Sequence, residues 1–439
     1  MDRFRANMAV LACLLASNAH ARQPAECLTG AIDAARWLAT HAIETEHGLT
    51  WPVDPENEAT LSDILYSGAS GVVLFHVELF SATDDEQWLP IARAGADNLI
   101  ANLPKTLAES QAGLYTGVAG IGFVLHRVYL ATDDQRYLDG ARECVRLIRD
   151  GAIKDDAGVT WGPVTDIIGG DAGVGLFLLY AHEEMGDETA LDLASGAGRS
   201  LLSRAIDADT GLTWRMTPDY ERLMPNFSHG TAGIAFFLAR LHEATGEGEF
   251  LDGAWQGVEH LRAVADTSDN AFAVHHHTPD GEDLYYLGWC HGPIGTSRAF
   301  EAMQRVSALP DWATLQTACA QTLKNYGVPE TRSPGYWENV SRCCGTAGMG
   351  DYFLARYQRT GDAADLAMAQ RCVEDLMGRA TRTEQGLKWV QAEHRVRPDF
   401  LVAQTGLAQG SAGIGLMLLR CDAAQKGRDW TLRFPDETP

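Results

Sequence analysis

Residues 288–295 read Gly-Trp-Cys-His-Gly-Pro-Ile-Gly, so a thiol and an imidazole stand side by side immediately before a Gly-x-x-Gly step. Both side chains are common ligands of zinc. Related stretches occur at 341–348, Ser-Arg-Cys-Cys-Gly-Thr-Ala-Gly, and at 226–233, Asn-Phe-Ser-His-Gly-Thr-Ala-Gly. The three copies predict that their cysteine and histidine side chains converge on one centre, and that the rest of the chain is the frame that brings them together.

The Gly-x-x-Gly step occurs seven times, and each copy is followed by a mainly apolar run. Successive copies lie 49 to 65 residues apart. A motif that recurs at such intervals predicts a repeat fold in which each copy belongs to one supersecondary unit. The seven glycine pairs are Gly68/Gly71, Gly117/Gly120, Gly170/Gly173, Gly230/Gly233, Gly292/Gly295, Gly345/Gly348 and Gly410/Gly413.

Each apolar run is paired with a second predicted helix. Most runs end in a polar turn such as Thr132-Asp133, whose side chains suit the first turn of a following helix. Amphipathic patterns then follow, for example over 137–148 and 366–377, and one more, over 27–43, precedes the first copy. Seven pairs of an outer amphipathic and an inner apolar helix predict an all-α fold, an α/α toroid of seven helical hairpins. An open solenoid is the alternative, although solenoid repeats are usually shorter and more even.

Four strand-like phrases lie between outer and inner helices, at 48–51, 158–161, 211–214 and 386–389. Each starts with glycine and ends with tryptophan, and they predict short β-hairpins at the mouth of the ring. The chain contains no low-complexity segment and no clear linker. We therefore expect residues 22–439 to form a single domain.

The N-terminus resembles a secretory signal. Arg3 and Arg5 precede an apolar run, and Ala19-His20-Ala21 fits a small-x-small cleavage site. We expect residues 1–21 to be removed and the remaining chain to be exported, to the periplasm or outside the cell. No later apolar stretch is long enough to predict stable membrane insertion. A formal net charge of −24 argues against nucleic acid as a partner.

Nine cysteines are present, one of them within the predicted signal. In an exported protein, cysteines often form disulfides. A chain of this length does not need a disulfide framework, and the spacing of the cysteines is irregular. Four cysteines within apolar helical patterns are interpreted as small core residues: Cys144, Cys319, Cys372 and Cys421.

The residues just before the first glycine differ between the copies. In chain order they are Ser67, Thr116, Gly169, His229, His291, Cys344 and Gln409, preceded by Tyr66, Tyr115, Ile168, Ser228, Cys290, Cys343 and Ala408. Histidine and cysteine occur only in the fourth, fifth and sixth copies, which are neighbours in a ring.

These neighbouring copies predict a zinc site made by Cys290, Cys343 and Cys344, with an open fourth position and with His229 moving protons. Nearby helix N-termini would help to hold the negative charge of the thiolates. The competing interpretation is a set of buried thiols. His291 competes for the ligand role and is expected to line the site. The run His275–His277 is interpreted as a solvated surface tract.

With these motifs the chain resembles the lanthionine synthetase C-like (LanC-like) family, the lantibiotic cyclases. The resemblance covers essentially all of residues 22–439 and rests on the seven glycine repeats, Trp289-Cys290-x-Gly292 and Cys343-Cys344-Gly345. It implies that the three cysteines bind Zn²⁺, that His229 is an acid/base residue, and that Asp166, in Asp-Ile-Ile-Gly-Gly, is the active-site aspartate.

Trp289, His291 and Tyr286 are expected to line the site. The last two depart from the family pattern. His291 stands where the family often has tyrosine, and Tyr286 stands where lantibiotic cyclases carry an arginine. A secretion signal is also unexpected, because these enzymes usually act in the cytosol.

The resemblance and the predicted site together indicate a zinc-dependent enzyme that adds a thiol to dehydroalanine or dehydrobutyrine and so forms a thioether. Its partner would be a dehydrated peptide or a small thiol. A non-catalytic protein of the same fold that binds zinc, a thiol or a peptide is the second hypothesis. The third is a carbohydrate-active toroid in which Trp51, Trp161, Trp214 and Trp389 stack on sugars, although the paired cysteines count against it.

Overall fold

The computed structural model describes residues 24–110, 112–308, 311–331 and 339–439. The predicted signal peptide, residues 1–21, lies outside these ranges. Among the described residues, no helix combines the length and apolar character that a membrane span needs.

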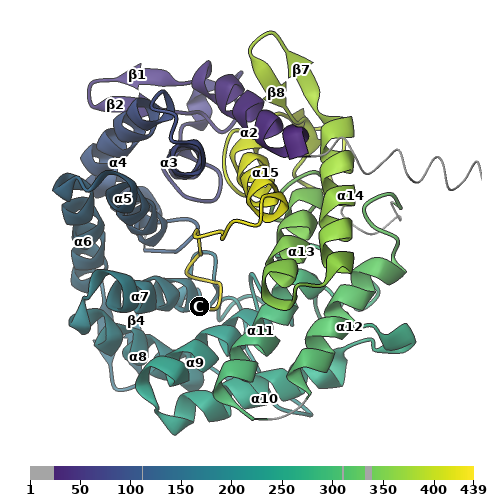
Figure 1. The fold of residues 1–439 in the computed structure, drawn as a ribbon. Helices are drawn as coiled ribbons and strands as arrows, with labels where there is room; N and C mark the ends of the chain where they lie inside the picture. Colours follow the sequence, from purple (N-terminus) through teal and green to yellow (C-terminus); the bar gives the residue numbers. More distant parts are fainter. Residues whose placement is uncertain (1–23, 111, 309–310, 332–338) are drawn as a thin grey trace, which may run out of the picture.

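Fourteen α-helices in the described ranges form seven hairpins arranged in a ring (Figure 1). Each inner helix packs on the outer helix that follows it, and α15 packs on α2, which closes the circle. The predicted α/α toroid is therefore confirmed. The inner helices are α3 (Ala69–Thr83), α5 (Val118–Thr132), α7 (Asp171–Met185), α9 (Thr231–Thr245), α11 (Pro293–Val306), α13 (Thr346–Thr360) and α15 (Ser411–Gln425). The outer helices are α2 (Pro24–Ala39), α4 (Trp88–Ser110), α6 (Gln135–Asp150), α8 (Glu188–Ser203), α10 (Gly248–Val264), α12 (Trp312–Asn325) and α14 (Ala363–Arg379).

The inner helices are apolar because both the outer helices and their inner neighbours cover them. In α7, every residue from Asp171 to Ala181 is buried. Cys144, Cys319 and Cys372 are buried and unpaired, as expected of core residues. Cys421 differs from the prediction, because it forms a disulfide with Cys27 that joins α15 to α2. The two residues are 394 positions apart in sequence, and only closure of the ring brings them together.

The Gly-x-x-Gly step allows the loop before each inner helix to fold back on the first turn of that helix. The first glycine is the N-cap in all seven copies. In six copies a Cβ on the second glycine would overlap the carbonyl oxygen six residues earlier, for example Ile167 against Gly173. Glycine is required here by close approach of two backbone segments.

These loops are joined to one another by backbone hydrogen bonds that run around the whole ring. Each loop donates one N–H to a carbonyl of the next loop over 2.7–3.3 Å, and the seventh loop donates to the first. The donor–acceptor pairs are Tyr66–Tyr115, Tyr115–Ile168, Ile167–Ser228, Ser228–Cys290, Cys290–Cys343, Cys343–Ala408 and Ala408–Tyr66. Residues that stand at the same place before the first glycine of each copy therefore lie side by side at one end of the toroid.

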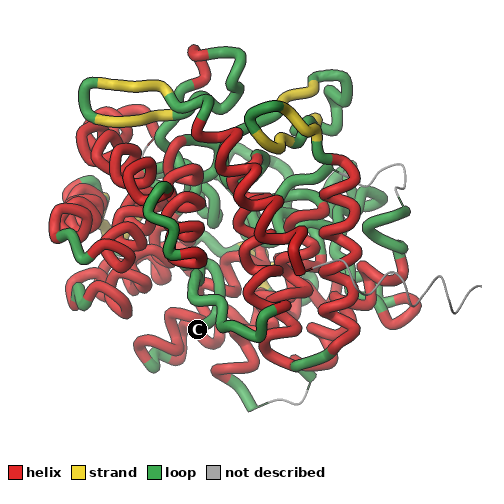
Figure 2. The backbone as a smooth tube through the Cα atoms, turned by 45° about the horizontal axis from the view of Figure 1, so that its top comes forward, coloured by secondary structure: helices red, strands yellow, loops and turns green. Residues whose placement is uncertain are grey.

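The four predicted hairpins are present, and a fifth lies before α15. The most visible strands, in yellow, lie at the upper end of the view in Figure 2. The hairpins pair β1 (Ile43–Thr45) with β2 (Gly48–Thr50), β3 (Ile153–Asp155) with β4 (Gly158–Thr160), β5 (Ile206–Asp207) with β6 (Leu212–Thr213), β7 (Thr381–Thr383) with β8 (Gly386–Lys388), and β9 (Gln391–Ala392) with β10 (Leu401–Val402). Two short 3₁₀ helices, η1 (Glu58–Thr60) and η2 (Ser268–Asn270), complete the described elements.

The four tryptophans that end the predicted phrases do not form a sugar-binding surface. Trp51, Trp214 and Trp389 are fully buried, and Trp161 is half-buried. Each indole N–H donates to a carbonyl in the last turn of the preceding outer helix, as in Trp389 to Leu376 at 2.7 Å. The tryptophans therefore donate hydrogen bonds to carbonyl groups at the ends of the outer helices, where regular intrahelical partners run out, and the carbohydrate hypothesis loses its main support.

We expect Gly173→Ala to lower the free energy of unfolding by about 2 kcal/mol or more, because the added methyl group would displace the Ile167 loop. Gly378→Ala is the matched control, since a methyl group added at this exposed position of α14 would have no neighbouring atom within 4 Å. This control should stabilise the helix by about 0.5–1 kcal/mol. Urea unfolding of both variants measures the difference, and equal stabilities would contradict the close-approach argument.

Candidate metal centre

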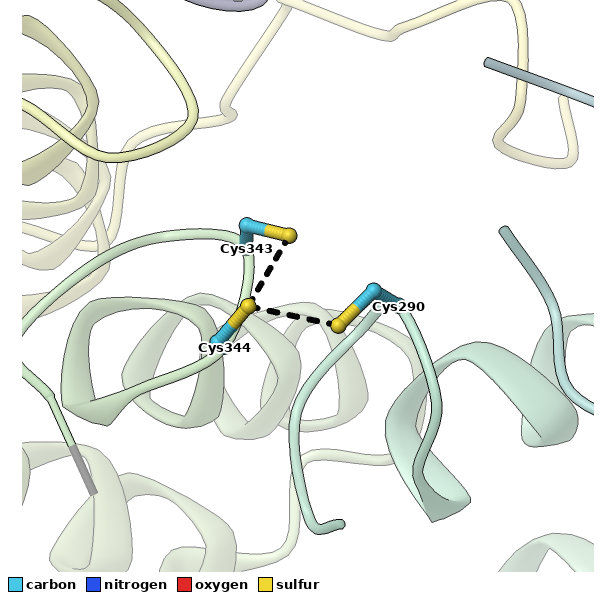
Figure 3. Close-up of side chains that lie close together, drawn as sticks. All are labelled: Cys290, Cys343 and Cys344. Atoms are coloured by element: carbon cyan, nitrogen blue, oxygen red, sulfur yellow. Dashed lines mark hydrogen bonds between the residues drawn. The ribbon is translucent and has the colours of Figure 1, made fainter. Parts of the chain in front are cut away.

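Three buried cysteines meet at the end of the ring where the inner helices begin (Figure 3). Cys290 comes from the loop before α11, and Cys343 and Cys344 come from the loop before α13. The Sγ atom of Cys344 lies 3.3 Å from that of Cys290 and 3.2 Å from that of Cys343. All three Sγ atoms lie within 4.8 Å of one another.

This group fits a thiolate-bound metal ion. In a zinc tetrahedron with Zn–S bonds of about 2.3 Å, sulfur atoms are separated by about 3.8 Å, close to the separations found here. Adjacent thiolates without a cation would repel one another in a buried site. The hydrogen bonds of Cys290 and Cys344 to Cys343 lower the pKa of the Cys343 thiol well below its ordinary value, whereas the hydrogen bond with Cys343 raises the pKa of Cys290 and burial raises that of Cys344. A cation is therefore needed to hold all three as thiolates. The cluster can therefore hold a metal, with a fourth position left to another ligand.

Two polar side chains next to the thiols were not singled out from the sequence. The Tyr66 hydroxyl donates to Cys343 Sγ at 3.4 Å, and Gln409 Nε2 contacts Cys344 Sγ at 3.6 Å. Gln409 also donates to the Tyr66 hydroxyl at 3.0 Å. Both residues occupy the same positions before the glycine as the cysteines do in their own copies. That shared register was the sequence signal that could have identified them.

His229 and Asp166 form a pair at the same end of the ring. His229 Nδ1 lies 2.6 Å from Asp166 Oδ2, while Asp166 Oδ1 accepts the backbone N–H groups of Gly169 and Gly170 at the start of α7. Burial lowers the pKa of His229, but the hydrogen bond and charge of Asp166 outweigh this effect and raise the pKa above its ordinary value. The carboxylate fixes the ring through Nδ1 and leaves Nε2 as the nitrogen available to another molecule.

A cavity of about 260 Å³ joins the cysteines to His229. Its lining comes from several loops and is formed by Tyr66, Thr116, Ile168, Ser228, His229, Cys290, His291, Cys343, Cys344, Glu393 and His394. A small molecule or one side chain of a peptide could enter a space of this size and reach both the thiols and the imidazole.

His291 lies within an aromatic cluster beside the cavity. The His276 ring stacks on His291 with 4.1 Å between ring centroids, and the Tyr286 ring meets both histidines edge-on. Burial and the neighbouring histidines lower the pKa of His291 well below its ordinary value. The expectation that His275–His277 form a solvated tract was therefore wrong, since His277 is buried and His276 packs against the site.

Trp289, which we expected to line the site, faces the interior of the ring instead. Its ring lies 5.1 Å from that of Tyr115, and its indole N–H donates to the Asp436 carboxylate at 3.0 Å. The residue before Cys290 is thus tied to the C-terminal segment, while Cys290 itself faces the cavity.

The β9–β10 hairpin borders the cavity with Glu393 and His394. Beyond these residues it exposes Val396, Phe400 and Leu401, which are 80%, 48% and 60% accessible. Arg395 of the same hairpin donates to the Tyr286 hydroxyl at 3.1 Å, so the hairpin is anchored to the aromatic cluster. The hairpin that lines the cavity thus also exposes three apolar side chains.

The sequence profile of the family described as lanthionine synthetase C-like protein matches residues 59–433. Among solved structures, nisin cyclase is similar over 83% of this chain and 89% of its own, with a TM-score of 0.58 and 16% identity. An unsaturated glucuronyl hydrolase from Streptococcus agalactiae is similar over 93% of this chain and 94% of its own, with a TM-score of 0.50 and 9% identity. At these identities the two structures show a common fold. No curated protein sequence gives a significant match.

We expect Cys290→Ala and Cys344→Ala each to remove most of the bound zinc, because two thiolates cannot replace a three-thiolate set. Cys319→Ala is the matched control, since Cys319 is equally buried but lies in α12 outside the cluster. Elemental analysis of the folded proteins measures the metal per chain. Equal zinc contents in all three variants would contradict the site.

Proposed function

Because this chain belongs to the lanthionine synthetase C-like family, we propose that it is a cyclase-like enzyme that adds a thiol to a dehydroamino acid and forms a thioether. The observation that carries the proposal is the position of three cysteine thiols and the His229–Asp166 pair around one cavity. A thiol-binding group and a proton-transfer group are the two components that this addition needs.

Cys290, Cys343 and Cys344 would hold Zn²⁺, the cofactor that the family implies. When bound, zinc lowers the pKa of a substrate thiol and so supplies a thiolate at neutral pH. Tyr66 and Gln409 surround the cysteine sulfurs with hydrogen-bond donors and fix their positions. The three cysteines are themselves buried, so a nucleophile held beside them would lose part of its hydration shell.

His229 would act as the acid that completes the reaction. The substrate thiol releases its proton to solvent, its sulfur forms a bond to the β-carbon of dehydroalanine or dehydrobutyrine, and the double-bond electrons move towards the α-carbon and the adjacent carbonyl. His229 then donates a proton through Nε2 to the α-carbon. Asp166 holds His229 in place through Nδ1 and stabilises its charged form. The overall reaction adds one S–H across one C=C bond, with no oxidant or reductant.

A dehydrated peptide is the substrate that the surroundings of the cavity favour. The β9–β10 hairpin lines the cavity with Glu393 and His394 and also exposes Val396, Phe400 and Leu401, and exposed apolar residues gathered on one hairpin can serve as a contact surface. A small thiol could enter the same cavity as a second reactant. His291 would then contact the substrate at the cavity wall, held in place by the rings of His276 and Tyr286.

We expect His229→Ala to abolish turnover of a dehydroalanine peptide while zinc content stays near that of the unsubstituted protein. His229 is not one of the three thiol ligands, and its loss removes only the proton donor. Asp166→Asn should reduce kcat by about 10²-fold or more because it weakens control of the imidazole. Mass spectrometry of the product and elemental analysis of the protein measure the two effects separately.

Loss of zinc in His229→Ala would exclude the role as an acid and make the histidine part of the metal site. A zinc-containing, unsubstituted protein that binds the dehydrated peptide but never forms a thioether would favour the non-catalytic binding protein.

We also propose that the chain is exported after cleavage near Ala21 and that residues 22–439 act as one domain. The Cys27–Cys421 disulfide supports export, because such bonds persist mainly in oxidising compartments. We expect protein isolated from the host to start near Arg22 and to be found in the periplasm or medium. N-terminal peptide mapping of fractionated cells measures this, and a cytosolic chain that retains residues 1–21 would contradict export.

A further inference from the structure

The C-terminal segment leaves α15 and crosses the middle of the ring (Figure 1). It is well buried there: Leu432 and Phe434 are 2% and 4% accessible, and Asp436 is fully buried. A buried carboxylate is costly unless several donors compensate its charge. The partners of Asp436 therefore indicate what the segment is held against.

The Asp436 carboxylate joins loops from distant parts of the ring. Its Oδ1 accepts from the Tyr115 hydroxyl at 3.0 Å, and its Oδ2 accepts from Trp289 Nε1 at 3.0 Å. Arg298 of α11 adds an ion pair at 2.5 Å. Tyr115 belongs to the second glycine copy and Trp289 to the fifth, so a single side chain connects two non-adjacent loops across the interior.

Phe434 of the same segment contacts the other cysteine loop. The guanidinium of Arg342 lies 4.2 Å from the centre of the Phe434 ring, a cation–π contact. Arg342 also pairs with Asp351 of α13 at 3.1 Å. Arg342 immediately precedes Cys343, just as Trp289 immediately precedes Cys290. In each of the two cysteine loops, the C-terminal segment thus contacts the residue that directly precedes a cysteine: Trp289 before Cys290, and Arg342 before Cys343.

We propose that residues 432–437 are a positioning element for the metal centre, in which Asp436 and Phe434 set the separation of the two cysteine loops. The inference rests on the proposed function, since it requires that these loops bind a metal. Neither residue touches the reacting atoms. They act through Trp289 and Arg342, and such supporting contacts typically change metal affinity by about 10- to 100-fold.

The test measures zinc affinity by competition with a chelator on the folded, full-length protein. We expect Asp436→Ala to weaken zinc binding about 10- to 100-fold, because the Trp289 and Tyr115 donors lose their common acceptor. The absorption spectrum of the Co²⁺-loaded variant should also shift, since the thiolate geometry around the metal changes. Asp436→Asn, which retains one acceptor oxygen, should recover part of the affinity.

Asp365→Ala is the matched control. Asp365 is an equally buried carboxylate near the start of α14, in the outer layer of the ring, where it pairs with Arg356 at 3.1 Å. Its substitution should lower the thermal midpoint without altering zinc affinity. If Asp436→Ala does not fold, Phe434→Leu keeps an apolar side chain, loses the Arg342 contact, and should still weaken zinc binding severalfold.

Unchanged zinc affinity and an unchanged Co²⁺ spectrum in folded Asp436→Ala and Phe434→Leu would overturn the inference and leave the proposed function standing. A protein without substitutions that binds neither Zn²⁺ nor Co²⁺ in reduced form would overturn both. An equal loss of affinity in Asp365→Ala would show a general effect of lower stability and would also overturn the positioning role.

Discussion

The backbone hydrogen bonds that link the seven loops are the constraint on which the rest of the structure depends. They require all seven loops to lie at the same height along the ring axis, so that each loop donates one N–H to the next loop and accepts one from the loop before it. Each loop can fold back on its own inner helix only because the first turn of that helix carries glycine where another residue's Cβ would meet the loop backbone, as at Gly173. Buried backbone groups must be paired, so the closed ring also satisfies N–H and carbonyl groups of the loop residues, which no helix pairs.

The same ring explains how a site can be built from single residues in separate repeats. Residues just before the glycine lie side by side from one copy to the next, so Cys290 and Cys344 meet although 54 positions separate them. Closure matters as well, because the seventh loop bonds to the first and brings Gln409 and Tyr66 to the thiols. The chemistry therefore depends on the register of the loops more than on any local motif.

Much of the fold followed from periodicity. The glycine copies and the alternation of apolar and amphipathic runs predicted seven helical hairpins, and the tryptophan phrases predicted the first four β-hairpins. The role of those tryptophans could not be predicted, since an indole suits a sugar surface and a buried helix end equally well. His276 was misjudged for a related reason: a polar run gives no indication that one member stacks on His291.

The sequence by itself determined the repeat, the helical class and the three cysteines, because spacing and residue type are local properties of the chain. Tertiary structure alone decided the pairing of Cys27 with Cys421, of His229 with Asp166, and of Asp436 with Trp289. These contacts join residues tens to hundreds of positions apart, and they exist only once the ring has closed. No pattern along the chain encodes such a distance, whereas the closed ring brings each of these groups within reach of its partners.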